Sequence, residues 1–318
     1  MKEKTLIVEI SGKRPGTKQQ RPTEKNKTEY PHIIISNNSE GYDTDWEIVN
    51  VPKEYEEWYK SVAKTSDNAW YAPMNRSYAI KYAREHGYRY LVQLDDNITF
   101  LEISYAQKAK GGINKRYKAQ SADEMIDDFV DTLVTVLQCT NAAMAGCNLS
   151  GVANPYSEAT KYLQERFVYS FFALDVDRCP DLFQGDFEDD VEFRLKLKQM
   201  GVPSVQVVPL RYSKTGQAKN KDLTGCRKAY AEAGVKRGEH MRKLYGNIYS
   251  CGMRSKSNCI TSQAEAGVAY FKHILKPFKV GVLVKDKEKI DAQMRYLFKK
   301  WAKEPKCSCK IKEKRVKG

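Results

Sequence analysis

The sequence lacks the long apolar runs of a membrane protein. None of its apolar stretches approaches the roughly 18 residues that a membrane-spanning helix requires. The short apolar stretch near the N-terminus is interrupted by Glu9, which argues against a secretory signal. The sequence also has no internal repeat. Its hydrophobic fraction of 41% suffices for a sizeable core, so we expect a folded, cytoplasmic protein.

The eight cysteines lack the paired CxxC spacing that is typical of zinc sites. In a cytoplasmic protein we expect them to be reduced thiols in the core or in loops. One alternative stays open, because Cys251 and Cys259 could join Cys307 and Cys309 in a four-thiolate metal site.

Acidic residues are outnumbered. The 54 Lys and Arg residues exceed the 40 Asp and Glu residues, which gives a net charge of +14 and favours a polyanionic partner such as nucleic acid. The basic residues cluster in segments 13–27, 107–118 and 211–228 and in the tail from residue 299. These segments are either solubilising loops or the lining of a groove for a phosphate backbone. Among them, Tyr105, Tyr117 and Tyr212 are either ordinary tyrosines or platforms on which bases stack.

Periodicity and turn residues divide the chain into alternating strands and helices. Apolar runs predict strands over 29–36, 46–52, 88–94, 141–150, 166–177, 202–213 and 280–284. Helical spacing predicts helices over 53–64, 75–86, 121–139, 186–201, 223–246, 261–276 and 286–302, the third with a capping box of Ser121 and Glu124. The alternation predicts an α/β fold with a mostly parallel central sheet flanked by helices. In such folds ligands bind at the carboxyl ends of the strands.

Two acidic clusters lie at such positions. Asp95, Asp96 and Asn97 directly follow the apolar strand 88–94, where carboxylates could hold a hard cation bound to substrate phosphates, or could simply form a turn. The second cluster, at the start of helix 186–201, contains Glu188, Asp189 and Asp190. Acidic residues favour helix N-termini, but three together exceed what capping needs, and one could accept a proton from an attacking hydroxyl.

The stretch 75–97, NRSYAIKYAREHGYRYLVQLDDN, resembles the part of GT-A type glycosyltransferases in which a helix leads into a strand that ends in the DxD motif. The stretch 189–201, DDVEFRLKLKQMG, resembles the later "ED" helix of the same superfamily. The resemblance spans roughly residues 30 to 215. It implies a nucleotide-diphospho-sugar transferase fold over 29–250, preceded by a basic strand or loop over 1–28 and followed by a helical extension with a basic tail over 251–318.

The resemblance assigns roles to individual residues. It implies that Asp95 and Asp96 contact the ribose and the metal–diphosphate, with Mn²⁺ or Mg²⁺ as cofactor and a UDP-sugar as donor. Asn97 stands where the family usually has a second aspartate ligand, which leaves Asp96 to carry most of the metal binding. The remaining nucleotide-binding residues that it implies are Ser36, Asn37, Asn38 and Arg76.

The ED motif supplies the general base of inverting enzymes. The spacing to Gly201 matches this role to Asp190, with Asp189 in the glutamate position, while an alternative register uses Glu188 and Asp189. The family also often has a late histidine ligand for the metal. Among the four histidines, His240 is the best match to that position.

More narrowly, the chain is similar to the TET/JBP-associated glycosyltransferases of phages and kinetoplastids. That resemblance implies transfer of a hexose, such as glucose, to the hydroxymethyl group of a modified pyrimidine such as 5-hydroxymethylcytosine in DNA, within a phage-infected bacterial cell. Two alternatives stay open. One is a metal-dependent nuclease or nucleotidyltransferase, against which the sequence lacks an Asp…Glu-x-Lys arrangement. The other is an inactive DNA-binding protein on a GT-A-like scaffold. Asn97, in place of the usual second aspartate ligand, favours this alternative.

Overall fold

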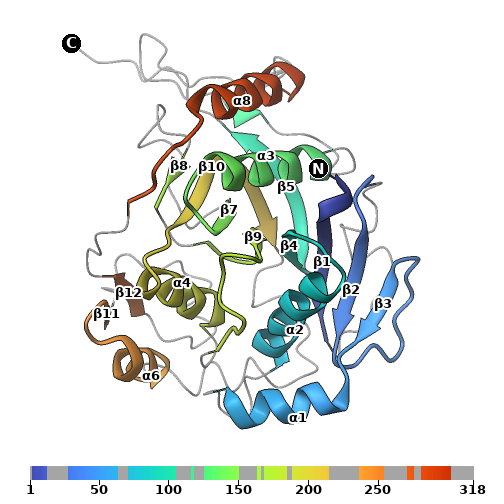
Figure 1. Ribbon diagram of the computed structural model, residues 1–318, viewed down its shortest axis with the longest axis vertical. Helices are drawn as coiled ribbons and strands as arrows, with labels where there is room; N and C mark the ends of the chain where they lie inside the picture. Colours follow the sequence, from blue (N-terminus) through green and yellow to red (C-terminus); the bar gives the residue numbers. More distant parts are fainter. Residues whose placement is uncertain are drawn as a thin grey trace, which may run out of the picture.

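The computed structural model describes residues 2–12, 28–63, 71–104, 116–117, 125–149, 163–165, 168–184, 188–214, 236–253, 271–275 and 281–301 (Figure 1). In these residues a ten-stranded sheet carries helices on both faces, which confirms the predicted α/β class. None of the described helices is long and apolar enough to cross a membrane.

The strands of the main sheet lie in the order β3-β2-β1-β4-β9-β7-β10-β5-β6, and β8 pairs with β10. Their bounds are β1 Thr5–Ser11, β2 His32–Ser36, β3 Glu47–Asn50, β4 Tyr90–Asp95, β5 Ile98–Ser104, β6 Arg116–Tyr117, β7 Met144–Leu149, β8 Leu163–Gln164, β9 Phe171–Asp175 and β10 Ser204–Lys214. The predicted strands around 29–36, 46–52, 88–94, 141–150, 166–177 and 202–213 are all present, mostly in shorter form.

The sheet is mixed, which corrects the expectation of a mostly parallel one. β1 pairs in parallel with β2 and β4, β2 with β3, and β7 with β10. β9 lies antiparallel between β4 and β7, and β5 is antiparallel to β10. A strand that is covered on both faces is an apolar run in either direction, so the sequence pattern does not reveal which way it points.

β1 is an inner strand of this sheet, although it belongs to the segment 1–28 that the sequence separates from the main domain. It pairs with β2 on one side and β4 on the other, and all seven of its residues are buried. Glu9 in its middle gives the strand the appearance of a short, interrupted apolar stretch. The proposed three-part division of the chain remains a prediction, but β1 contributes directly to the core.

The helices form a layer on each face of the sheet (Figure 1). Helices α3 and α8 share a core cluster with one face, and α1, α2 and α4 share a cluster with the other. α6 packs on α4 through Met241 and Tyr245. The bounds are α1 Lys53–Val62, α2 Tyr71–Glu85, α3 Ile126–Cys139, α4 Asp189–Gln199, α6 Lys236–Tyr245 and α8 Lys287–Trp301.

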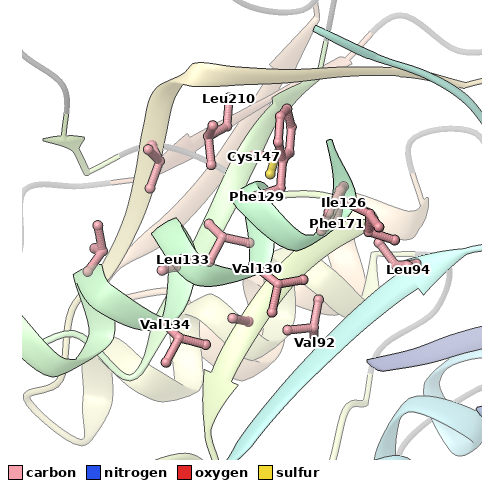
Figure 2. Packing of buried hydrophobic residues seen from close by; sticks show 14 of the residues in the cluster. Val92, Leu94, Ile126, Phe129, Val130, Leu133, Val134, Cys147, Phe171 and Leu210 are labelled. Atoms are coloured by element: carbon pink, nitrogen blue, oxygen red, sulfur yellow. The ribbon is translucent and has the colours of Figure 1, made fainter. Parts of the chain in front are cut away.

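Alternation along β4 decides which face each side chain joins. Val92 and Leu94 belong to the cluster under α3, whereas Leu91 belongs to the cluster under α1, α2 and α4. Figure 2 shows Val130 of α3 close to Val92 of β4, among the apolar side chains of α3 that face the sheet. The buried strand therefore places its last residue, Asp95, at a fixed point on the edge of the sheet.

Several predicted elements differ from the structure. α3 begins at Ile126, and the proposed cap residues Ser121 and Glu124 lie outside the described residues. Residues 271–275, predicted as helix, form strand β12 (Phe271–Leu275), which pairs antiparallel with β11 (Tyr249–Met253). Pairing with a distant segment overrides a local helical pattern there. Of the predicted strand 280–284 the structure describes 281–284, and among these residues only Val284 makes a bridge, to Thr140.

Candidate active site at the carboxyl ends of β1, β2 and β4

The site is built on the edge where three parallel strands end. Ser11 of β1 lies in register with Ser36 of β2, and Ile10 lies in register with Asp95 of β4. Residues that follow these strands therefore meet at one edge. This is where the sequence predicts the ligand site of an α/β fold.

Arg76 of α2 holds Asp95 in place. Its Nη2 donates to Oδ1 of Asp95 at 2.5 Å, and its Nη1 donates to Oε1 of Gln93 at 3.3 Å. Gln93 in turn donates to the backbone carbonyl of Arg76 at 3.1 Å. Because Gln93 is fully buried inside β4, the guanidinium is fixed to the strand that carries the carboxylate.

The same guanidinium reaches the second acidic cluster. Nε of Arg76 lies 2.9 Å from Oδ2 of Asp189, at the start of α4. The Arg76 side chain is only 5% exposed, and the Asp189 side chain 15%. Burial alone would lower the pKa of Arg76, but the carboxylates of Asp95 and Asp189 outweigh it and hold the pKa above its usual value. One buried arginine thus joins two clusters that are about ninety residues apart in sequence.

Asp190 is the neighbouring carboxylate on α4. Burial raises the pKa of Asp190 well above its usual range, and the nearby charges of Asp189 and Glu188 raise it further. Arg76 and Lys214 act in the opposite direction. The pKa of Asp189 is also raised, chiefly by burial, although Arg76 opposes the shift. A carboxyl group with a raised pKa binds a proton more readily than an ordinary aspartate does, which suits a general base.

Glu188 caps the start of α4 through its backbone. Its carbonyl accepts the N–H of Glu192 at 2.8 Å, the first bond of the helix, and its side chain is buried. The acidic start of α4 therefore combines a backbone role for Glu188 with the carboxylates of Asp189, which pairs with Arg76, and Asp190.

Asp96 is held from the β1 side. Oγ of Ser11 donates to Oδ2 of Asp96 at 2.8 Å and lies 2.8 Å from the hydroxyl of Tyr42. Nδ2 of Asn75 donates to the carbonyl of Ser11 at 2.9 Å and to Oδ1 of Asn37 at 3.3 Å. The sequence predicts roles for Asn37 and Asp96 but does not single out Ser11, Tyr42 or Asn75, because hydroxyl and amide side chains at strand ends are too common to be a signal.

Ser36 and Asn38 form the turn after β2. Ser36 is fully buried, and its Oγ accepts the backbone N–H of Asn38 at 3.1 Å. Oδ1 of Asn38 accepts the N–H of Glu40 at 3.1 Å. Both side chains therefore shape the loop beside Asn37. Their predicted contacts with a nucleotide base remain predictions.

The predicted metal ligands are only partly assembled. Oδ1 of Asn97 is buried and has no hydrogen-bond partner among the described residues, so an oxygen donor lies next to the Asp96 carboxylate in sequence. These oxygen donors fit a hard cation such as Mg²⁺ or Mn²⁺, which binds one or two carboxylates together with substrate phosphates. Nε2 of His240, on α6, is also buried and has no partner within the described part of the chain. Among the residues that the structure describes, however, no three His, Cys, Asp or Glu side chains form a metal cluster.

Lys214, the last residue of β10, lies at the site, although the sequence predicts it to belong to a basic surface segment. Its Nζ lies 3.3 Å from Oδ2 of Asp95 and donates to Oγ of Ser170 at 2.7 Å. The sequence places Lys214 in the basic segment 211–228, which it interprets as a surface for nucleic acid. A lysine at the carboxyl end of a predicted strand is the signal that could have located it at the site.

Two neighbours of Lys214 contradict that surface interpretation. Nη1 of Arg211 donates to Oε1 of Glu102 at 3.1 Å, and both side chains are buried. Tyr212 is fully buried, and its hydroxyl donates to the carbonyl of Tyr169 at 2.5 Å, so it cannot stack on a base. Arg211 and Tyr212 are successive residues of β10, so their side chains point to opposite faces of the sheet, and both are buried there. Tyr105 and residues 107–115 lie outside the described residues, as do residues 215–228, Cys259, Cys307 and Cys309.

The family model described as TET-Associated Glycosyltransferase matches residues 17–221, well over half of the chain. This chain belongs to the TET-associated glycosyltransferase family. It is therefore a glycosyltransferase, as the motifs at 75–97 and 189–201 predict. The match includes Asp95, Asp96, Asp189, Asp190 and Lys214 but ends before His240. Membership in the family favours sugar transfer over the nuclease alternative.

No curated protein matches the chain. Among solved structures, it is similar to the crystal structure of glucosyl-3-phosphoglycerate synthase from Mycobacterium tuberculosis in complex with Mg²⁺ and uridine-diphosphate. The two share 10% sequence identity with a TM-score of 0.44, and the alignment covers 88% of this chain and 90% of that one.

Proposed function

We propose that this TET-associated glycosyltransferase moves a hexose from a UDP-sugar to the hydroxymethyl oxygen of a modified pyrimidine in DNA. The observation that carries the proposal is the bridge by Arg76, which contacts Asp95 at 2.5 Å and Asp189 at 2.9 Å. The donor-binding end of β4 and the acidic start of α4 thereby belong to one site. A transferase needs both, because the donor and the group that activates the acceptor must be held together.

The donor half of the proposal rests on the ends of β2 and β4. Asn75 and Arg76 hold Asn37 and Asp95 in place at the strand ends where a nucleotide would bind. Asp96 and Asn97 would hold a divalent cation, which neutralises charge on a departing diphosphate when it is bound. His240 remains a candidate for a further ligand.

The acceptor half of the proposal rests on Asp190. Arg76 is paired with Asp189, so Asp190 is the better candidate for the base. In the reaction the hydroxymethyl oxygen forms a bond to the anomeric carbon while the bond from that carbon to the diphosphate oxygen breaks. The diphosphate keeps the electron pair, and the hydroxyl proton passes to the Asp190 carboxylate.

DNA as acceptor is supported by the net charge of +14 and by the family to which the chain belongs. A nucleobase inside a duplex is stacked, so the modified base has to turn out of the helix to reach a protein side chain. Because Arg211 is buried in an ion pair, the phosphate contacts must come from other basic residues. The segments 13–27, 107–118 and 215–228 are the candidates.

The decisive experiment combines the purified protein with Mn²⁺, a panel of sugar nucleotides and duplex DNA that carries 5-hydroxymethylcytosine or 5-hydroxymethyluracil. The DNA is digested and its nucleosides are weighed. A gain of one hexose on the modified base is expected, with no gain on unmodified DNA and none with Asp190→Asn.

Other outcomes would separate the alternatives. Sugar-nucleotide hydrolysis without transfer to DNA would support a sugar nucleotide as donor and argue against DNA as acceptor. Phosphodiester cleavage would support a nuclease. DNA binding that ignores both sugar nucleotide and metal would support an inactive binding protein.

A further inference from the structure

We propose that Lys214 binds the diphosphate of the sugar nucleotide and stabilises the charge that develops on it as the sugar leaves. This inference rests on the proposed function, because it concerns the same donor site. It assigns Lys214 to the leaving group rather than to the DNA backbone.

The position of Lys214 follows from the directions of the strands. β4 is antiparallel to β9, β9 is antiparallel to β7, and β7 is parallel to β10. The carboxyl end of β10 therefore lies at the same edge of the sheet as the carboxyl end of β4. This explains why Nζ of Lys214 lies 3.3 Å from Asp95, a residue 119 positions away in sequence.

Ser170 fixes the ammonium group. Its Oγ accepts from Nζ of Lys214 at 2.7 Å, and its carbonyl accepts the backbone N–H of Asp95 at 3.0 Å. Ser170 has a φ of 50°, in the left-handed region that residues other than glycine rarely adopt. The backbone before β9 is thus held in an uncommon conformation that joins Lys214 to Asp95, and strain of this kind is concentrated at functional sites.

Of the two cations that the structure describes in this cluster, Arg76 and Lys214, Lys214 is the more exposed. Arg76 is 5% exposed and is occupied by Asp95, Asp189 and Gln93, whereas the Lys214 side chain is 26% exposed. An ammonium group has three N–H donors, and Asp95 and Ser170 account for two of them among the residues that the structure describes. The remaining donor is available to an anionic ligand.

The charges at the site require such a cation. Asp95 and Asp189 both pair with Arg76, and Asp96 follows Asp95 in the chain, so a diphosphate bound at this end of β4 would meet several negative charges. Asn97 adds an oxygen donor without the negative charge of an aspartate, which weakens attraction for a metal ion. Lys214, whose Nζ lies 3.3 Å from the Asp95 carboxylate, supplies positive charge that offsets part of this loss.

The test compares binding of UDP and of uridine by calorimetry, in EDTA and in Mn²⁺, for the wild type, Lys214→Met and Lys214→Arg. We expect Lys214→Met to weaken UDP binding about 10- to 100-fold, the loss typical of one hydrogen bond to a charged group, and to leave uridine binding unchanged. Lys214→Arg should restore most of the affinity for UDP. In turnover, Lys214→Met should lower kcat as well as raise KM, because the charge on the leaving group increases in the transition state.

Lys300→Met is a matched control. It removes a lysine that pairs with Asp128 at 2.8 Å on the α8 side of the molecule, and it should leave both ligands unaffected. A structural role for Lys214 predicts an equal loss of UDP and uridine binding, and that result would overturn the inference, as would unchanged binding of both. If the wild type binds no nucleoside diphosphate among UDP, GDP, ADP and dTDP, the proposed donor class itself is wrong.

Discussion

At the scale of single residues, the two neighbouring aspartates of α4 have different surroundings. Asp189 faces the guanidinium of Arg76 at 2.9 Å, whereas Oδ1 of Asp190 accepts only a local backbone N–H, that of Val191 at 2.8 Å, among its described hydrogen bonds. Two carboxylates with the same chemistry can therefore serve different purposes. Asp189 pairs with the arginine, and we propose that Asp190 is the carboxylate that takes the proton.

The first prediction concerns Asp190→Asn. We expect it to lower kcat by about 10²- to 10⁴-fold, the usual contribution of a general base, without weakening donor binding. A base acts when it is deprotonated, so in the wild type kcat/KM should rise with pH through a value above the usual pKa of an aspartate. Steady-state kinetics as a function of pH measure both effects.

Asp181→Asn is the control for this prediction, because Asp181 is exposed and pairs with Arg84 away from the site. Its kinetics should match those of the wild type. Full activity in Asp190→Asn would move the role of base to Asp189 or Glu188.

The second prediction concerns Arg76→Met. Removing the arginine leaves Asp95 and Asp189 without their shared cation, and breaking a buried ion pair in this way costs about 3–5 kcal/mol. We expect the free energy of unfolding, measured by urea denaturation, to fall by that amount. Lys81→Met breaks an exposed pair with Glu85 and should cost at most about 1 kcal/mol. Equal effects of the two substitutions would show that the bridge by Arg76 contributes little.

At the scale of elements, α4 is fixed at its start by Arg76 and along its length by α6. Glu192 of α4 is fully buried, accepts from the hydroxyl of Tyr245 on α6 and from the N–H of Gln184, and pairs with Lys196 at 3.3 Å. Burial raises the pKa of Glu192 from 4.5 to about 7, although these partners oppose the shift. The packing of α6 on α4 therefore depends on pH.

The third prediction follows from the sign of that shift. The folded state holds the proton of Glu192 more tightly than the unfolded state does, so this group stabilises the fold fully below pH 4.5. The contribution, on the order of 3 kcal/mol, is lost as the pH rises through about 7. Glu192→Gln should remove this part of the pH dependence.

Denaturation curves collected between pH 4 and 8 measure the difference between the variant and the wild type. Glu239→Gln, on the exposed side of α6, serves as the control and should follow the wild-type curve. Parallel curves for Glu192→Gln and the wild type would contradict the prediction.

At the scale of the whole molecule, the excess positive charge should govern the interaction with DNA. If about four lysines or arginines contact phosphates, affinity for a duplex should fall roughly 100-fold between about 50 and 200 mM salt. Fluorescence anisotropy with labelled duplexes measures the slope. Arg211→Met should reduce stability but leave this slope unchanged, since Arg211 is buried against Glu102. A salt-independent affinity would argue against phosphate contacts.

Local patterns in the sequence determined most of the elements. The apolar run 88–94 reappears as strand β4, because a strand buried on both faces needs apolar residues throughout. The helical spacing of 286–302 reappears as α8, because a helix buried along one stripe has apolar residues at intervals of three or four. The acidic clusters after β4 and at the start of α4 were also visible, since carboxylates interrupt an apolar pattern. The resemblance of the stretches that contain them, 75–97 and 189–201, to GT-A type glycosyltransferases predicted the enzyme class.

Only the tertiary structure decided which distant residues meet. It placed β1 between β2 and β4, inserted β9 antiparallel between β4 and β7, and paired β11 with β12. The contacts of Arg76 with Asp189 and of Lys214 with Asp95 and Ser170 follow from that arrangement of strands. The physical reason is that strand order and direction depend on pairing between segments far apart in the chain, which leaves no periodic signal within either segment.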